Sequence, residues 1–370
     1  MTTTAPMTQT RGVIQQGIDA GLHLGAQLYV SINGKTVASF ATGQARAGVP
    51  MTVDSLMLWM SSTKPVAAVA IAQLWERGLL ELDDRIVKFI PPFGENGKEA
   101  ITIRHILTHT AGFRAPPRSL EKSWETIINE INGMRLERDW VPGQKAGYHP
   151  QSSWFVLGEI VRIVDGRSYS RYVREAIFEP IGMSDSWIGM PAEECDAYGD
   201  RISVMHKILS DGRAVPLAAK PVATSCRPGS SGYGPIHELG RFYEMLLSRG
   251  QWDGKRIISP QSVEALTARH RAGMYDETFK QRIDWGLGFL LNSSEPGDLP
   301  YAYGPAASRR TFGHGGAESS GGFCDPERGL AVAYAFNGQP GEAKHHERRK
   351  ALVAAIDEDL ATDGAQMNTD

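Results

Sequence analysis

A serine followed three residues later by a lysine, Ser61-Ser62-Thr63-Lys64, is the pattern in this sequence with the clearest chemistry. A serine hydroxyl becomes a nucleophile when a neighbour removes its proton, and a lysine can do so once its pKa is depressed. Residues three apart share a helix face, so Lys64 is placed one turn from Ser61. Pro65 predicts that regular helix begins here, which puts Ser61 at the positive end of the helix dipole.

The chain holds a second copy of this pattern, from Ser119 to Lys122, and the surroundings separate the two. An isolated Ser-x-x-Lys is usually a solvated helix start, and Ser119 has no apolar helix behind it. Ser61 instead follows the apolar run LMLWM and precedes an almost uncharged helix. Because an unpaired buried lysine is costly, Lys64 is the lysine that indicates a functional role.

Two further segments carry groups that serine chemistry needs. Tyr148 precedes an amphipathic helix, and its phenol could move protons beside a serine nucleophile. His314, Gly315, Gly316 and Ala317 suggest a strand in which the glycines allow a close approach by backbone or ligand. Open N–H groups of an edge strand can bind substrate and supply an oxyanion-hole donor. Taken singly, Tyr148 is more often a core or capping aromatic, and His314 the exposed histidine of a tight turn.

The elements that position these residues are strands near both ends of the chain and helices between them. Residues 26–45 predict a hairpin that turns at Asn33-Gly34, and the helix after Ser61 ends at Gly78. Further helices are expected at 101–110, 120–133, 151–164, 169–177, 236–249 and 342–361, and strands at 285–292, 310–316, 320–329 and 330–338.

This order of elements predicts an α/β fold of the α+β kind, an antiparallel sheet flanked by helices together with an α-rich lobe. Residues 1–90 and 285–370 are expected to form one discontinuous α/β lobe. Residues 91–284 are expected to form a mostly helical lobe, with the active site between the two.

Charge and cysteine usage exclude several classes of protein. A net charge of -3 over 370 residues offers no attraction for nucleic acid or an anionic membrane. No stretch approaches the apolar length of a membrane span. Cys195, Cys226 and Cys324 are widely spaced, so they form neither a disulfide framework nor a metal-binding pair. A reduced, cytoplasmic location is the simplest interpretation.

The remaining histidines and glycine-rich motifs predict no metal and no cofactor. His105 and His109 stand four apart, but no HExxH motif and no third carboxylate ligand accompany them, so they are interpreted as structural. His345 and His346 lie in a charged terminal helix and are expected at the surface. Neither a G-x-S-x-G elbow nor a phosphate-binding loop is present.

Taken together and in this order, the motifs resemble the serine β-lactamase and penicillin-binding-protein-like superfamily, in particular its class C-like branch. The resemblance runs from about residue 12 to 360 and includes SSTK, TIRHILTHTAGF, PGQKAGYHP, IFEPIGMSDSW and the HGG strand. It implies a β-lactamase/transpeptidase-like fold, acylation of Ser61, and proton transfer shared by Lys64 and Tyr148. It also implies an oxyanion hole formed by the N–H groups of Ser61 and Ala317.

Two departures from the family pattern bear on the substrate. Pro150 stands where the family's Tyr-x-Asn motif has asparagine, and proline has neither a side-chain amide nor an N–H with which to contact a substrate amide. His314 in place of lysine removes a permanent positive charge that could meet a β-lactam carboxylate. Both favour ester cleavage or acyl transfer over β-lactam or peptide hydrolysis.

The sequence therefore predicts a serine hydrolase, closest in character to family VIII carboxylesterases, that acts on small or medium esters through an acyl-enzyme on Ser61. The alternatives are a biosynthetic acyltransferase or transesterase, a D-amino-acid amidase or peptidase, a weak β-lactamase, and a non-catalytic ligand-binding homologue. The expected partner is a small-molecule ester or amide, with no nucleic acid and no membrane, and the oligomeric state stays open.

Overall fold

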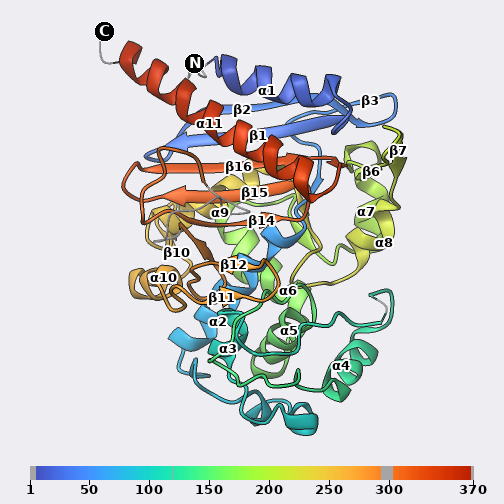
Figure 1. The fold of residues 1–370 in the computed structure, drawn as a ribbon, viewed down its shortest axis with the longest axis vertical. Coiled ribbons are helices and arrows are strands. Elements are labelled where there is room, and N and C mark those ends of the chain that lie inside the picture. The colour runs from blue at the N-terminus through green and yellow to red at the C-terminus, as the bar shows by residue number, and fades with distance from the viewer. Residues whose placement is uncertain (1–5, 119, 293–302, 368–370) are drawn as a thin grey trace.

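Strands from the two ends of the chain join in one antiparallel sheet (Figure 1). The computed structural model describes residues 6–118, 120–292 and 303–367, and it orders this sheet β13-β14-β15-β16-β1-β2-β3. The strands are β1 (Gly25–Ile32), β2 (Lys35–Arg46), β3 (Val49–Pro50), β13 (Leu290–Leu291), β14 (Phe312–Gly316), β15 (Ser320–Asp325) and β16 (Leu330–Phe336). Because β1 pairs with β16, the N-terminal and C-terminal strands meet in the middle of the sheet.

The predicted hairpin is confirmed, and β14 is close to being an edge strand. Asn33 and Gly34 both have positive φ, 50° and 73°, as a two-residue hairpin loop requires. In the predicted strand 285–292, only Leu290–Leu291 form β13, and within β14 they pair only with Phe312 and Gly313. Among the described strands, residues 314–316 of β14 therefore have a neighbour on one side only, β15.

The sheet is buried on both faces because its strands alternate between two cores. On β16, Val332 and Phe336 face α1 (Thr8–Asp19) and α11 (Glu342–Met367), which lie across the sheet in Figure 1. The alternating Ala331, Ala333 and Ala335 face the other core, which includes α9 (Ile236–Leu247). Small side chains on this face allow α9 to approach the sheet closely.

Below the sheet in Figure 1, helices form the second part of the molecule. They are α2 (Lys64–Glu76), α3 (Ile103–Leu107), α4 (Trp124–Gly133), α5 (Ser152–Asp165) and α6 (Tyr169–Val173). The predicted ranges 101–110, 120–133 and 169–177 contain α3, α4 and α6, and the range 151–164 covers α5 to within one residue. The predicted helices at 236–249 and 342–361 correspond to α9 and α11, and α2 packs against α5. The division into two lobes stays a prediction, since α2 of the N-terminal part packs among these helices while α9 packs on the sheet.

Shorter elements, most of which the sequence pattern did not indicate, complete the described chain. The helices are α7 (Ala192–Tyr198), α8 (Ala219–Thr224) and α10 (Pro260–Thr267), with 3₁₀ turns η1 (Ser61–Thr63), η2 (Ile86–Lys88), η3 (Pro91–Gly97), η5 (Glu179–Ile181) and η6 (Gly199–Arg201) and a π-turn η4 (Arg174–Phe178). The strands are β4 (Met57–Leu58), β5 (Trp187–Ile188), β6 (His206–Ile208), β7 (Ala214–Pro216), β8 (Gly232–Gly234), β9 (Gln251–Trp252), β10 (Lys255–Arg256), β11 (Tyr275–Asp276), β12 (Gln281–Arg282) and β17 (Gly338–Gln339). None of the helices in the described ranges has both the length and the apolar character to cross a membrane.

The structure corrects one prediction about a polar residue, His345, and describes only part of the second Ser-x-x-Lys pattern. The expectation that His345 lies at the surface is wrong, since its side chain is 1% exposed and its Nδ1 lies 3.0 Å from Arg348 Nη2. The physical reason is that α11 lies flat against the sheet, so one side of a charged helix is buried. Ser119 lies outside the described residues, while Lys122 forms an exposed ion pair with Glu130.

Candidate active site

Ser61 stands where a strained backbone turn begins a helix. It opens η1, which runs directly into α2, and the preceding Met60 has φ 48° and ψ −134°. Positive φ in a non-glycine residue persists only where neighbouring contacts enforce it. Thr63 provides such contacts, because its Oγ1 donates to the Met60 carbonyl at 2.6 Å and accepts from the Gly232 N–H at 2.9 Å. The predicted place of Ser61 at a helix entrance is confirmed.

Lys64 is fully buried and makes three short contacts. Its Nζ lies 3.0 Å from Ser61 Oγ, 2.9 Å from the Pro150 carbonyl oxygen and 2.8 Å from the Gly229 carbonyl oxygen. Burial lowers the pKa of Lys64 well below its usual range. A neutral amine has two N–H groups, which the two carbonyls accept, and one lone pair. The lone pair is then left for the Ser61 hydroxyl, which is the arrangement of a general base.

Tyr148 lies beside this pair of residues. Lys64 Nζ is 5.2 Å from the centroid of the Tyr148 ring. Burial raises the pKa of Tyr148, and a hydrogen bond with the Ser61 side chain opposes part of that rise. The phenol is therefore protonated at neutral pH and can pass a proton on. The structure thus brings the three predicted catalytic residues together.

The strand β14 is held against the nucleophile turn by side-chain hydrogen bonds. Ser62 Oγ donates to the His314 carbonyl at 3.1 Å and lies 3.1 Å from Ser320 Oγ, which in turn donates to the Trp59 carbonyl. Gly316 must be glycine here, because a Cβ atom would lie 2.4 Å from the Trp59 carbonyl oxygen. The end of β14 therefore lies beside the turn that carries the nucleophile.

The residues of this strand form a neutral, mostly buried wall. His314 is buried, and its Nδ1 lies 2.7 Å from the Gly315 carbonyl oxygen, so Nδ1–H is the donor of the neutral ring. Burial is the main cause that lowers the pKa of His314, to about 3. The expected exposed histidine of a tight turn is thus not what the structure has. Ala317 directly follows the strand and is partly exposed.

The sequence interpretation missed the role of His109 in the site. His109 is fully buried, and its ring lies 4.7 Å from the Tyr148 ring and 4.4 Å from the Trp285 ring, centroid to centroid. Its Nδ1 accepts from the N–H of His149 at 3.0 Å. His105, by contrast, caps α3 through Thr102 and stays away from the site. The only available signal for His109 was its place in the TIRHILTHTAGF motif.

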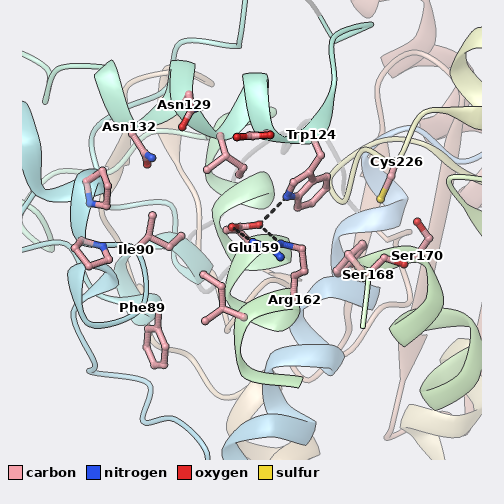
Figure 2. A pocket seen from close by; sticks show the side chains of 16 residues that line it. Phe89, Ile90, Trp124, Asn129, Asn132, Glu159, Arg162, Ser168, Ser170 and Cys226 are labelled. Atoms are coloured by element: carbon pink, nitrogen blue, oxygen red, sulfur yellow. Dashed lines mark hydrogen bonds and ion pairs between the residues drawn. The ribbon is translucent and has the colours of Figure 1, made fainter. Parts of the chain in front are cut away.

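A separate pocket of about 670 Å³ opens among the helices (Figure 2). In it, Glu159 accepts from Trp124 Nε1 at 2.7 Å and pairs with Arg162 at 2.7 Å. None of the candidate catalytic residues lines this pocket. Within the described residues, no group of three or more His, Cys, Asp or Glu side chains is placed to hold a metal ion.

Comparisons with known proteins show which family and which solved structures this chain is similar to. A family model described as "Beta-lactamase" matches residues 10–355. The esterase/beta-lactamase LipL of Mycobacterium tuberculosis is 26% identical over 346 residues, which are 85% of this chain and 77% of LipL. A solved penicillin-binding protein homologue from Caulobacter crescentus superposes with a TM-score of 0.80 at 30% identity, over 97% of this chain and 99% of the homologue. A solved family VIII carboxylesterase superposes with a TM-score of 0.79 at 26% identity, over 96% and 98%.

Proposed function

Because the chain belongs to the beta-lactamase family and is a serine hydrolase, we propose that it is a carboxylesterase that cleaves small or medium esters through an acyl-enzyme on Ser61. The observation that carries this proposal is the arrangement at Lys64. Two carbonyls accept hydrogen bonds from the N–H groups of its amine, and the remaining contact is to Ser61 Oγ. The printed descriptions of LipL and of the family VIII carboxylesterase support an ester as substrate.

In the acylation step, Ser61 Oγ bonds to the ester carbonyl carbon while its proton passes to Lys64 Nζ. The N–H groups of Ser61 and Ala317 stabilise the oxyanion, an interaction worth roughly 3 kcal/mol per donor. The bond from carbon to the alkoxide oxygen then breaks. Tyr148 protonates the departing alkoxide and is reprotonated from Lys64, which returns to its neutral form. Water repeats the sequence on the acyl-enzyme and releases the acid.

The groups around the nucleophile favour an ester over an amide or a β-lactam. Pro150 uses its carbonyl to hold Lys64 and has no side-chain amide for a substrate amide. His314 is neutral because its pKa lies at about 3, so it offers no cation to a substrate carboxylate. An ester needs neither contact, since its carbonyl binds through the oxyanion hole alone.

The proposal is tested by p-nitrophenyl ester turnover together with labelling by a fluorophosphonate probe. Ser61→Ala should abolish both turnover and labelling, and mass spectrometry should place the adduct on Ser61. Ser119→Ala, which changes the serine of the second Ser-x-x-Lys pattern, is the matched control and should retain wild-type activity. Absence of labelling in the wild type would instead favour a non-catalytic binding protein.

The same assay separates hydrolysis from acyl transfer. Alcohols or amines are added during ester turnover, and the products are analysed for a new ester or amide. We expect the free acid to dominate, as the proposal requires. A transfer product that dominates at low acceptor concentration would assign the chain to the acyltransferases instead.

The cytoplasmic location suggested by the cysteines stays a prediction.

A further inference from the structure

Tyr148 lies in a segment without regular secondary structure, so contacts from elsewhere must fix its place. Its backbone N–H donates to Asp276 Oδ1 at 3.1 Å, and its carbonyl accepts from Thr278 Oγ1 at 3.1 Å. Both partners belong to the turn that begins at β11. We propose that Asp276 is a positioning residue, which holds the Tyr148 hydroxyl at Ser61 by fixing the peptide from which Tyr148 projects.

The Asp276 carboxylate is itself held rigidly. It is fully buried, and its Oδ2 lies 2.7 Å from Nη2 of Arg271, which is also buried. Oδ1 accepts two further backbone N–H groups, those of Thr278 and Phe279, at 2.9 and 3.0 Å. Charge-assisted hydrogen bonds of this kind are strong and directional, whereas buried ion pairs often add little net stability. A requirement for fixed geometry therefore explains this pair better than a requirement for stability.

The residues on either side of Tyr148 are anchored differently. The Gly147 N–H donates to the His109 carbonyl at 3.0 Å, and the His149 N–H donates to His109 Nδ1 at 3.0 Å. Three successive N–H groups thus have defined acceptors, and the central one, that of Tyr148, is the one bound by Asp276. Loss of the Asp276 carboxylate would release the Tyr148 peptide while its neighbours stay anchored to His109.

This inference rests on the proposed catalytic role of Tyr148. Reacting groups must lie within a fraction of an ångström of their productive positions, and a misplacement of about 1 Å can reduce the rate roughly 100-fold. Asp276 is buried behind Tyr148 and bonds to its backbone. Its removal should therefore lower kcat and leave KM nearly unchanged.

The test uses Asp276→Asn in the full-length chain, assayed with p-nitrophenyl esters. Asparagine has one acceptor oxygen, so it cannot serve Arg271 and three N–H groups together. We expect kcat to fall about 30-fold and KM to stay within about threefold. In a Tyr148→Phe background, Asp276→Asn should cause no further loss, because its effect runs through the tyrosine hydroxyl.

Asp284→Asn is the matched control. Asp284 is also a fully buried carboxylate, pairs with Arg269 and accepts the Gly273 N–H at 2.8 Å, but has no hydrogen bond to Tyr148. Its kcat should stay at the wild-type value below the unfolding temperature. If Asp276→Asn does not fold, Thr278→Val, which removes the exposed hydroxyl bonded to the Tyr148 carbonyl, should show a smaller loss of kcat with the same dependence on the Tyr148 hydroxyl.

The outcomes separate this inference from the proposed function. Losses that multiply in the double variant, or equal losses in Asp276→Asn and Asp284→Asn, would show a general structural effect and overturn the inference alone. Unchanged turnover in Asp276→Asn, with impaired turnover in Tyr148→Phe, would do the same. Unchanged turnover in Tyr148→Phe would instead remove Tyr148 from the proposed mechanism, and the positioning role with it.

Discussion

Lys64 and Lys98 are both buried completely, yet their surroundings suit different charge states of the lysine. Those of Lys64 suit a neutral amine, and those of Lys98 suit an ammonium. The Nζ of Lys98 lies 5.1 Å from the centroid of an aromatic ring, and that of Lys64 lies 5.2 Å from one. Each makes three polar contacts. Lys98 donates to three backbone carbonyls, those of Glu95, Asn132 and Met134. Lys64 has two carbonyls and, in the third position, the Ser61 hydroxyl.

The third partner decides which form of the lysine fits. A carbonyl can only accept, so three carbonyls require the three N–H groups of an ammonium, whereas a hydroxyl can donate to the lone pair of a neutral amine. Burial lowers the pKa of Lys98 to about 8, with the Glu95 carboxylate acting against the shift. Burial also lowers the pKa of Lys64, well below its usual range. Burial alone therefore does not distinguish the two lysines, whereas the hydroxyl among the partners of Lys64 does.

The largest expected effect is the loss of turnover in Lys64→Met. Methionine matches the length of lysine but cannot accept the Ser61 proton, so kcat for p-nitrophenyl esters should fall roughly 100- to 10,000-fold. The free energy of unfolding should fall less than in Lys98→Met, since two carbonyls lose their donor instead of three and a buried group whose charged form is unfavourable is also removed. Ester hydrolysis and urea unfolding measure the two effects. Retention of more than a tenth of wild-type kcat would exclude Lys64 as the base.

Lys98→Met should show the opposite pattern. It leaves three carbonyl oxygens without their donor, so the free energy of unfolding should fall by about 3 kcal/mol. Because Lys98 has no contact with the nucleophile, kcat at a temperature where the variant is folded should stay within about twofold of wild type. The same two measurements apply. A tenfold loss of kcat in the folded variant would contradict the comparison between the two lysines.

The pH dependence of stability should sharpen this comparison. In the unfolded chain Lys98 has its ordinary pKa of 10.5, and in the folded chain about 8. Between these values the unfolded state binds more protons, so the Lys98 contribution to the free energy of unfolding rises with pH, by at most ~1.4 kcal/mol per pH unit. Urea unfolding across this window should show that the free energy of unfolding of the wild type rises relative to that of Lys98→Met as the pH increases. A difference that is independent of pH would mean that folding leaves the pKa of Lys98 unchanged.

The sequence predicted the parts of the site that depend on local pattern. Ser61 and Lys64 are three residues apart, so helical geometry alone places them together. The partners of Lys64, the carbonyls of Pro150 and Gly229, come from distant segments. Every residue has a backbone carbonyl, so the sequence does not show which of them binds the lysine. Lys98 escaped notice for the same reason, since its three partners are also carbonyls. Asp276 resembles any surface aspartate until the fold places it behind Tyr148.

The fold shows the same limit. The Asn33-Gly34 hairpin and the order of helices and strands followed from turn chemistry and periodicity. The predicted strand 285–292 contains only Leu290–Leu291 as a strand, because the chain turns back between Trp285 and Leu290, which bridge each other. Trp285 also forms a bridge with Arg271. The apolar pattern of residues 285–292 predicts that they are buried, but it does not predict which residues their backbone pairs with. The packing of α9 on the sheet was likewise invisible, since an amphipathic helix does not reveal what covers its apolar face.

The smallest expected effect concerns a link between the two carbonyls that hold Lys64. Gln151 follows Pro150 and Ser230 follows Gly229, and Ser230 Oγ donates to Gln151 Oε1 at 3.1 Å. Ser230→Ala removes this link and loosens the carbonyls relative to each other. One hydrogen bond contributes about 1 kcal/mol, so kcat in ester hydrolysis should fall about fivefold.

The counterpart of this variant on the Lys98 side is Ser123→Ala. Ser123 caps the start of α4, whose C-terminal end supplies carbonyls to Lys98. Loss of the cap should lower the free energy of unfolding by about 1 kcal/mol and leave kcat unchanged. Urea unfolding and ester hydrolysis on both variants compare the two surroundings directly. If Ser230→Ala lost stability but not kcat, as Ser123→Ala should, the carbonyls around Lys64 would be structural in the same sense as those around Lys98, and the Ser61 hydroxyl alone would distinguish the two lysines.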